Sequence, residues 1–377
     1  MSGALIQVVS KGAQDVYLNS EEGHSFFRTR FTRHTNFSQA PKFIKTVTDQ
    51  DPVVTIPILG DLVNCIWFEG LSRYSNVSSN LLYNSTIDLY IGGQKIDSQH
   101  YDYYADIWPN YLADTYTKCR EITNKTTESH RNFQPLHFFF CDHGAFLPLL
   151  ALSHHQVEIK INFDISSVAE IDATLRKINV YGNYIFLDKA ERESMISRQM
   201  DFVITQTQTQ EFPLSNVYNN QIESGGYNDF DISSFNHPVK SIFFGYSSTS
   251  PNSFNDRFTF KNADIHLNGT PLLENMSPTY FHTIQNYYKS KYGVSDFNTE
   301  TEDLMYTRYF AYHFSMNASD YNPSGSCNFS RLDNAKIIVR GAEKGSLQAD
   351  TQAVSVIAVN YNVLRIKNGL AGILFGN

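Results

Sequence analysis

Cysteine is scarce in this chain of 377 residues. The four that occur are Cys65, Cys119, Cys141 and Cys327. None forms a C-x-x-C pair, and their spacing fits no zinc or redox motif. We therefore expect buried free thiols in a reducing compartment in preference to a disulfide framework.

Long apolar runs are also missing. The longest strongly apolar stretch, residues 145–152, is far shorter than the roughly 20 residues that cross a bilayer. The first 18 residues, MSGALIQVVSKGAQDVYL, lack the apolar centre and cleavage pattern of a signal peptide. The expectation is a soluble protein that is made in the cytoplasm.

Positive charge is in deficit. Lys and Arg number 30 against 38 Asp and Glu, which gives a formal net charge of −8. A protein that coats nucleic acid directly is usually basic, because neutralising phosphates drives that binding. The acidic balance therefore argues against direct packaging of a genome.

Aromatic residues are abundant, with 28 Phe and 23 Tyr, and 41% of the chain is hydrophobic. The chain can thus bury a sizeable core, and its length suits two domains of roughly 180 residues. The aromatic residues, together with many Val, Ile, Thr and Asn residues, favour strands and turns over helices.

An internal repeat is visible by eye. Residues 63–68 read VNCIWF and residues 239–244 read VKSIFF, so the second segment follows the first at an offset of 176 in residue number. The same offset joins DLYIGG at 88–93 to DIHLNG at 264–269. In both copies an alternating strand enters a Gly-Gly or Asn-Gly dipeptide, which supplies the positive φ angles of a tight hairpin.

The aromatic segment after each hairpin continues the match and predicts a short helix in both copies. The same offset relates Tyr104 to Tyr280, Asn110 to Asn286, and Tyr111 to Tyr287. A third match places LLAL at 149–152 opposite VIAV at 356–359, at an offset of 207. That larger offset predicts a longer connection in the second copy, around residues 292–325. A period of roughly 180 residues indicates a duplicated domain and not a solenoid.

The predicted elements are mostly short strands. Residues 156–164 alternate between apolar and polar side chains, as in a strand with one buried face, and residues 149–152 and 354–359 are apolar runs that suit core strands. Helical patterns are limited to residues 101–119 and 187–201. This is typical of an antiparallel sandwich or barrel, and the jelly roll is one such fold that the pattern alone does not single out.

Several segments resemble the major capsid proteins of nucleocytoplasmic large DNA viruses. The resemblance spans nearly the whole chain, and its most specific parts are PSGSCNFSR and NYNVLR. The segments that carry it are residues 3–18, 26–38, 146–163, 236–240, 323–335 and 358–372.

The resemblance implies an all-β fold of two tandem eight-stranded antiparallel jelly rolls, a double jelly roll, with a few short helices in loops and linker. We divide the chain accordingly into an N-terminal arm (1–24), a first jelly roll (25–186), a linker (187–200) and a second jelly roll (201–377).

The resemblance also implies a function. The chain would be a structural capsid subunit and not an enzyme, and three copies would form a pseudo-hexagonal capsomer of an icosahedral virion. Its partners would be neighbouring capsomers, minor capsid and penton proteins and inner-membrane-associated viral proteins, without direct contact to nucleic acid. The protein would be made in the host cytoplasm and end in the virion. Residues 1–18 would form an arm on the inner face of the capsomer.

Two departures from the family stand out. The segment Cys141-Asp142-His143-Gly144 occupies a place where relatives tend to carry Arg-Asn after the cysteine, which puts local contacts there in doubt. The chain is also short for the family, which predicts reduced outward loops and a flatter outer face.

Candidate sites are few, and we expect no catalytic, cofactor-binding or metal-binding residues and no cofactor. His154 and His155 are adjacent, and on a strand they would point to opposite faces and could not share one metal ion. Asp142 and His143 lack an accompanying nucleophile motif, so a turn or an interface is the preferred interpretation.

Arg28, Arg30, Arg33 and His34 form a small basic cluster. They could contact lipid phosphates or a minor capsid protein, or simply form a solvated strand face.

Two other functions stay open from the residues alone. One is a double-barrel scaffold that shapes a membrane during virion assembly and is then discarded. The other is a carbohydrate-binding β-sandwich, although no carboxylate pair marks a glycosidase cleft.

Overall fold

The computed structural model describes residues 13–14, 27, 31, 33–70, 81–115, 117–118, 133–142, 144–164, 176–213, 227–246, 260–291, 309–342 and 353–376. The chain forms two units, Met1–Asn36 and Phe37–Asn377. The predicted arm lies almost wholly outside the described residues, as do Arg28 and Arg30 of the basic cluster. The division of the chain into arm, jelly rolls and linker stays a prediction.

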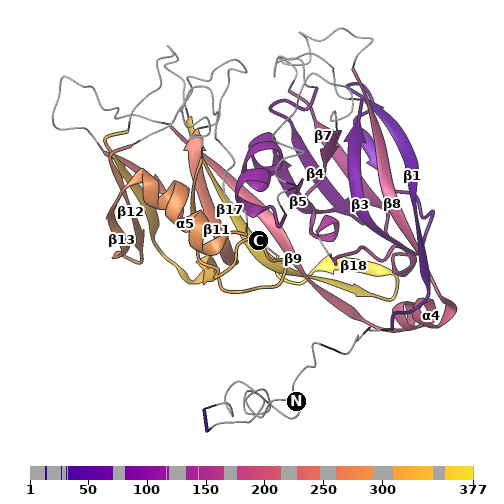
Figure 1. The fold of residues 1–377 in the computed structure, drawn as a ribbon. Coiled ribbons are helices and arrows are strands. Elements are labelled where there is room, and N and C mark those ends of the chain that lie inside the picture. Colours follow the sequence, from indigo (N-terminus) through magenta and orange to yellow (C-terminus); the bar gives the residue numbers. More distant parts are fainter. Residues whose placement is uncertain are drawn as a thin grey trace, which may run out of the picture. The chain divides into compact units, whose positions relative to one another are not determined.

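The first half of unit Phe37–Asn377 contains two four-stranded antiparallel sheets, with strand orders β1-β8-β3-β6 and β2-β7-β4-β5 (Figure 1). Their strands are β1 (Phe37–Thr48), β2 (Val53–Thr55), β3 (Leu62–Glu69), β4 (Thr86–Ile91), β5 (Gln94–His100), β6 (Phe133–Pro135), β7 (Val157–Asn162) and β8 (Lys177–Leu187).

The second half repeats this order. One sheet runs β9-β17-β11-β14, with β15 and β18 added at its margins, and the other runs β10-β16-β12-β13. Its strands are β9 (Met200–Pro213), β10 (Tyr227–Asp231), β11 (Pro238–Tyr246), β12 (Asn262–Leu267), β13 (Thr270–Met276), β14 (Tyr309–His313), β15 (Cys327–Asn328), β16 (Ala335–Arg340), β17 (Ala353–Lys367) and β18 (Leu370–Ile373). Eight strands shared between two antiparallel sheets in this interleaved order form a jelly roll, and the chain contains two.

Helices are short and connect the strands. A π-type helix, η3 (Asp102–Leu112), follows the first hairpin, and η8 (Tyr280–Ile284) with α5 (Gln285–Lys289) follows the second. Helix α4 (Lys189–Ser197) joins β8 to β9, and the Asp188 carboxylate caps it by accepting from the Lys189 N–H. Single 3₁₀ turns are η5 (Phe139–Cys141), η6 (Leu149–Ala151) and η9 (Phe329–Arg331).

The register of the sheets confirms the duplication and extends it. Val54 pairs with Ile159 in the first copy, and Phe230 pairs with Ile337 in the second. Val54 and Phe230 are again related by the offset of 176. The two tight turns are also confirmed, because Gly92 and Asn268 both have positive φ, 58° and 49°.

A β-bulge is shared by the two copies. Asn64 is the extra residue on β3, between Val63 and Cys65, and Lys240 is the extra residue on β11. These two positions are related by the same offset. A bulge re-aims side chains and sharpens the twist, so the copies share fine geometry as well as strand order.

The match at an offset of 207 is wrong. Residues 149–151 form the 3₁₀ turn η6 and not a core strand, although Leu149 and Leu152 are buried. β7 corresponds instead to β16 and β8 to β17, and Val180 and Val356 occupy equivalent places opposite Phe68 and Phe244. Val180 and Val356 keep the offset of 176, so the predicted long extension of the second copy does not exist.

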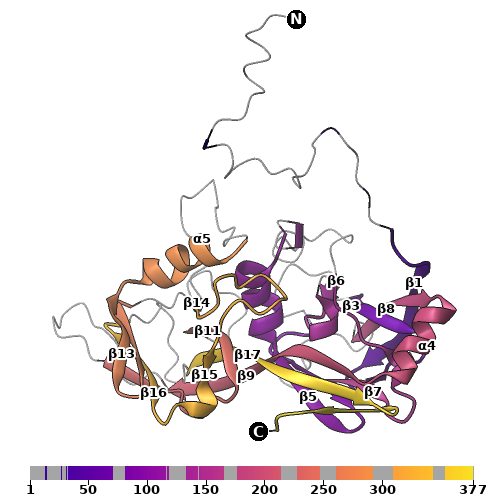
Figure 2. The same cartoon turned by 90° about the horizontal axis from the view of Figure 1, so that it is seen from below.

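The apolar core crosses from one jelly roll to the other. The larger buried cluster contains strand residues of the first copy, such as Leu89 and Ile159, together with Ile204, Phe243 and Tyr309 of the second. A smaller cluster around Phe230, Phe244 and Ile337 fills the second jelly roll. In Figure 2, η3 lies where the two groups of strands meet.

Candidate functional site: the contact between the two jelly rolls

The two jelly rolls meet through paired hydrogen bonds at β5 and β9. The Asp97 carboxylate accepts from the Thr207 N–H at 2.8 Å and from the Thr207 hydroxyl at 3.1 Å. The Ile96 carbonyl accepts from the Gln206 amide. Burial raises the pKa of Asp97, and the hydrogen bonds from Thr207 and from Gln99 oppose that shift by stabilising the charged form.

The end of η3 inserts into the second jelly roll. Tyr111 is fully buried, its ring centroid lies 5.6 Å from that of Phe243, and its hydroxyl donates to the Tyr309 carbonyl. The Tyr309 hydroxyl in turn donates to the Asp102 carboxylate at 2.6 Å, and Ser290 Oγ donates to the Tyr111 carbonyl at 2.9 Å. Buried aromatic rings that also satisfy their hydroxyls are strong interface anchors.

The C-terminal hairpin β17–β18 docks on the first jelly roll. The His154 N–H donates to the Gly369 carbonyl at 3.1 Å, and His155 Nδ1 accepts from the Ala371 N–H at 3.1 Å. The prediction that these histidines lie on a strand is wrong, because β7 begins only at Val157. Their contacts serve packing, and among the described residues no group of three or more His, Cys, Asp or Glu is placed to hold a metal ion.

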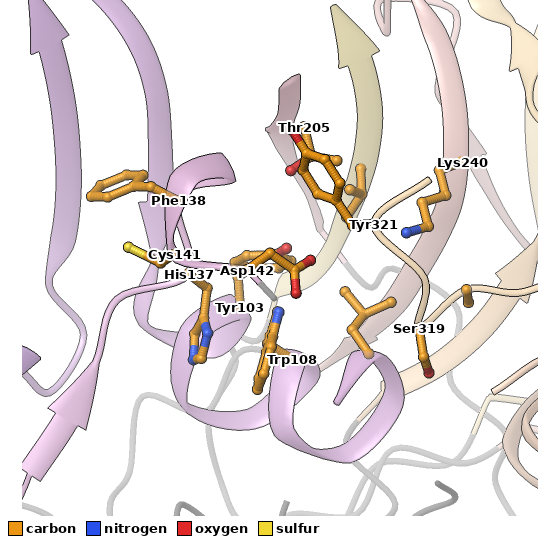
Figure 3. A pocket seen from close by; sticks show the side chains of 13 residues that line it. Tyr103, Trp108, His137, Phe138, Cys141, Asp142, Thr205, Lys240, Ser319 and Tyr321 are labelled. Atoms are coloured by element: carbon orange, nitrogen blue, oxygen red, sulfur yellow. The ribbon is translucent and has the colours of Figure 1, made fainter. Parts of the chain in front are cut away.

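A small cavity lies within the contact (Figure 3). Its volume is about 30 Å³, which suits one or two water molecules and no organic substrate. Lys240 and Asp142 reach it from opposite jelly rolls, and Lys240 Nζ donates to the Asp320 carbonyl at 2.8 Å. Burial lowers the pKa of Lys240 to about 8, and the charges of Asp142 and Asp320 oppose that shift.

Asp142, the acidic residue in the segment that the sequence analysis singled out, lies at this cavity. The negative charge of the Asp142 carboxylate acts on the buried Lys240 ammonium group of the other jelly roll. The two opposite charges therefore partly compensate each other within the contact. His143 lies outside the described residues. Sequence reasoning overlooked Lys240, whose only signal is its place as the bulge residue equivalent to Asn64.

The described cysteines, Cys65, Cys141 and Cys327, are free and half-buried, while Cys119 lies outside the described residues. Burial raises the pKa of the Cys141 thiol far above its ordinary value, so it stays protonated and unreactive at neutral pH. In the part of the chain that is described, no helix is long and apolar enough to cross a membrane.

Comparison with protein families gives two adjacent matches. Residues 25–188 match the model described as "Major capsid protein N-terminus", and residues 191–372 match "Large eukaryotic DNA virus major capsid protein". The first match ends directly after β8, and the second begins within α4, the helix that joins β8 to β9.

Curated relatives agree over the full length of both chains. The chain is 29% identical to the major capsid protein of Pyramimonas orientalis virus and 27% identical to that of Paramecium bursaria Chlorella virus 1, each with 100% of both sequences covered. These alignments extend over 419 and 454 positions, so the relatives carry insertions that this chain of 377 residues lacks.

Solved structures share the fold. The capsid protein VP54 of PBCV-1 superposes with a TM-score of 0.75 at 22% identity, over 94% of this chain and 100% of that chain. The Faustovirus major capsid protein gives a TM-score of 0.62 at 10% identity, over 95% of each chain. With two jelly rolls in tandem and matches from residue 25 to residue 372, the chain belongs to the family of major capsid proteins of large eukaryotic DNA viruses.

Proposed function

We propose that the chain is the shell-forming subunit of an icosahedral virion and acts as a trimer whose six jelly rolls build a pseudo-hexagonal capsomer. The observation that carries this proposal is the internal repeat: two jelly rolls with one strand order and one register, packed side by side. Relatives that are named major capsid proteins and align over the full chain support it.

The mechanism is assembly by burial of preformed surfaces. The fold supplies rigid sheets, and closed symmetry then fixes the geometry between copies. Obligate interfaces of this kind bury more than about 2,000 Å². We propose neighbouring capsomers, minor capsid and penton proteins and inner-membrane-associated viral proteins as further partners, and the virion as the destination.

We further propose that the chain is not an enzyme and acts without a cofactor. The cavity of about 30 Å³ within the contact between the jelly rolls is too small for an organic substrate, and the charge of Asp142 there acts on the buried Lys240 of the other jelly roll. The net charge of −8 supports a shell that does not touch the genome directly.

Mass measurement under native conditions tests the trimer. We expect a compact particle of three times 43.0 kDa that dissociates in SDS. A chain that stays monomeric at high concentration would contradict the proposal. A scaffold that is discarded during assembly would form the same particle, so mature virions are then analysed by mass spectrometry, where a scaffold would be missing.

A further inference from the structure

The two repeats bury equivalent residues very differently. Tyr111 and Leu112 at the end of η3 are 0% and 7% exposed, whereas Tyr287 and Tyr288, their counterparts on α5, are 78% and 76% exposed. The difference continues on the hairpin strand, where Ile96 is 2% exposed and its counterpart Leu272 is 43% exposed.

The first jelly roll thus presents a surface that the second jelly roll covers. The second jelly roll presents the equivalent surface with no cover from the described part of the chain. Tyr287 and Tyr288 lie with their ring centroids 4.9 Å apart, and Ile284, one turn earlier, is also 41% exposed. Exposed clustered aromatic side chains mark interaction surfaces.

The surface that Tyr111 contacts in the second jelly roll also differs from its counterpart in the first. Tyr111 packs on Phe243 and bonds to the Tyr309 carbonyl. By the offset of 176, the counterparts of Phe243 and Tyr309 in the first jelly roll are Trp67 and Phe133.

Trp67 and Phe133 line a cavity of about 320 Å³, together with Ile66, Trp108, Pro135 and Leu136. Apolar cavities of roughly 150 Å³ already take up benzene, so this one has room for a tyrosine ring. In the described part of the first jelly roll, the place equivalent to the one that Tyr111 fills in the second is therefore an apolar cavity.

We propose that Tyr287 and Tyr288 of one chain dock in the cavity lined by Trp67, Trp108 and Phe133 of a second copy, and so repeat between chains the contact that Tyr111 makes within one chain. This inference rests on the proposed self-assembly and names the surfaces that carry it. By the same correspondence, the Tyr287 hydroxyl donates to the Phe133 carbonyl of the other copy.

The repeated contact is less polar than the internal one. The Tyr309 hydroxyl bonds to Asp102 within the chain, but the counterparts of this pair are Phe133 and Pro278, which cannot form that bond. The contact between copies thus depends on apolar burial around two aromatic rings. Such rings at the centre of an interface typically supply most of its affinity.

The aromatic pair and the cavity are different surfaces of the same chain, so the contact between copies is head-to-tail. A head-to-tail contact generates either a closed ring or an open filament. Three copies that alternate internal and external contacts would place six jelly rolls in one ring.

Substitution at the exposed tyrosines tests the proposal. We expect Tyr287→Ala to weaken association of the full chain at least tenfold, and Tyr287→Ala with Tyr288→Ala to leave a folded monomer, as measured by sedimentation velocity over a concentration series. Tyr227→Ala is the matched control, because Tyr227 is 61% exposed on β10, outside both surfaces. It should associate like the native chain.

Cross-linking tests the partner surface without relying on a loss of function. Because the free cysteines Cys65 and Cys141 also line the cavity, the test is made in a chain with Cys65→Ser and Cys141→Ser. In that chain, adding Tyr287→Cys and Phe133→Cys together should give a covalent ladder that ends at three chains under mild oxidation, and neither change alone should do so. The contact is overturned if the variant Tyr287→Ala, Tyr288→Ala still forms a normal trimer, or if the trimer of the double cysteine variant gives no ladder. Either result leaves the proposed capsomer standing. A native chain that never associates overturns both.

Discussion

His313 on β14 is a buried histidine whose surroundings hold it neutral. Its Nδ1 lies 2.8 Å from Ser241 Oγ and its Nε2 lies 3.5 Å from Asn286 Oδ1. Burial, followed by the charges of Lys289 and Lys240, lowers its pKa from 6.5 to about 3. Between these values the unfolded chain binds a proton that the folded chain does not.

The stability that this histidine contributes is complete above pH 6.5 and is lost as the pH falls toward 3. At pH 5 the loss is about 2 kcal/mol, at roughly 1.4 kcal/mol for each pH unit. We expect His313→Gln to reduce, by about this amount, the difference between the free energies of unfolding in urea at pH 7.5 and at pH 5. His34→Gln, at an exposed position, is the control. An unchanged pH dependence in His313→Gln would count against a neutral His313.

At the scale of elements, the hairpins and the helices after them were predictable because turn chemistry is local. Gly92-Gly93 and Asn268-Gly269 need positive φ, and that need is written in the residues themselves. The sequence did not predict that β8 of the first copy and β17 of the second are equivalent strands. Val180 and Val356 agree, but Tyr181 and Ile357 fill the same place with different side chains.

Equivalent strands bury the same face, but the side chains on that face can differ in type. An apolar run such as 149–152 can therefore be mistaken for the equivalent of a core strand. The cavity at Trp67 and the contact at Lys240 depend on distant segments meeting, which no local pattern encodes. The family resemblance supplied the fold where periodicity left several sandwiches possible.

The two hairpins differ in what their turns can carry. Asn268 is native at a position where its side chain accepts from the Asp333 N–H at 2.9 Å. At the equivalent Gly92, a Cβ atom would lie 2.3 Å from His155 Nδ1, the atom that accepts from the Ala371 N–H. An asparagine, which the second turn has at position 268, therefore does not fit at position 92 of the first turn.

We expect Gly92→Asn to destabilise the chain by about 1–3 kcal/mol, because it displaces His155 and loosens the docked hairpin β17–β18. Gly93→Ala is the control, since no atom lies within 4 Å of its added Cβ and only the φ of 80° costs about 1 kcal/mol. Thermal midpoints and proteolysis near residue 370 measure the two effects. Equal effects from both variants would show that His155 does not restrict the turn.

At the scale of the whole molecule, the internal contact at Tyr111 and the proposed contact between chains at Tyr287 are equivalent. The internal contact forms at every protein concentration, whereas the contact between chains forms only when the protein concentration is high enough. Tyr111 and Tyr287 stand at equivalent places in these two situations, so the same substitution at each separates folding from assembly.

We expect Tyr111→Ala to cost about 3–5 kcal/mol, as for other large buried aromatic side chains, and to lower the thermal midpoint at every protein concentration. The native midpoint should rise with concentration, because association stabilises only the folded chain. Tyr287→Ala should keep the midpoint of the dilute native chain and lose most of that rise. If the two variants behave alike, Tyr287 stabilises the fold itself, and the equivalence between the internal and the external contact does not hold.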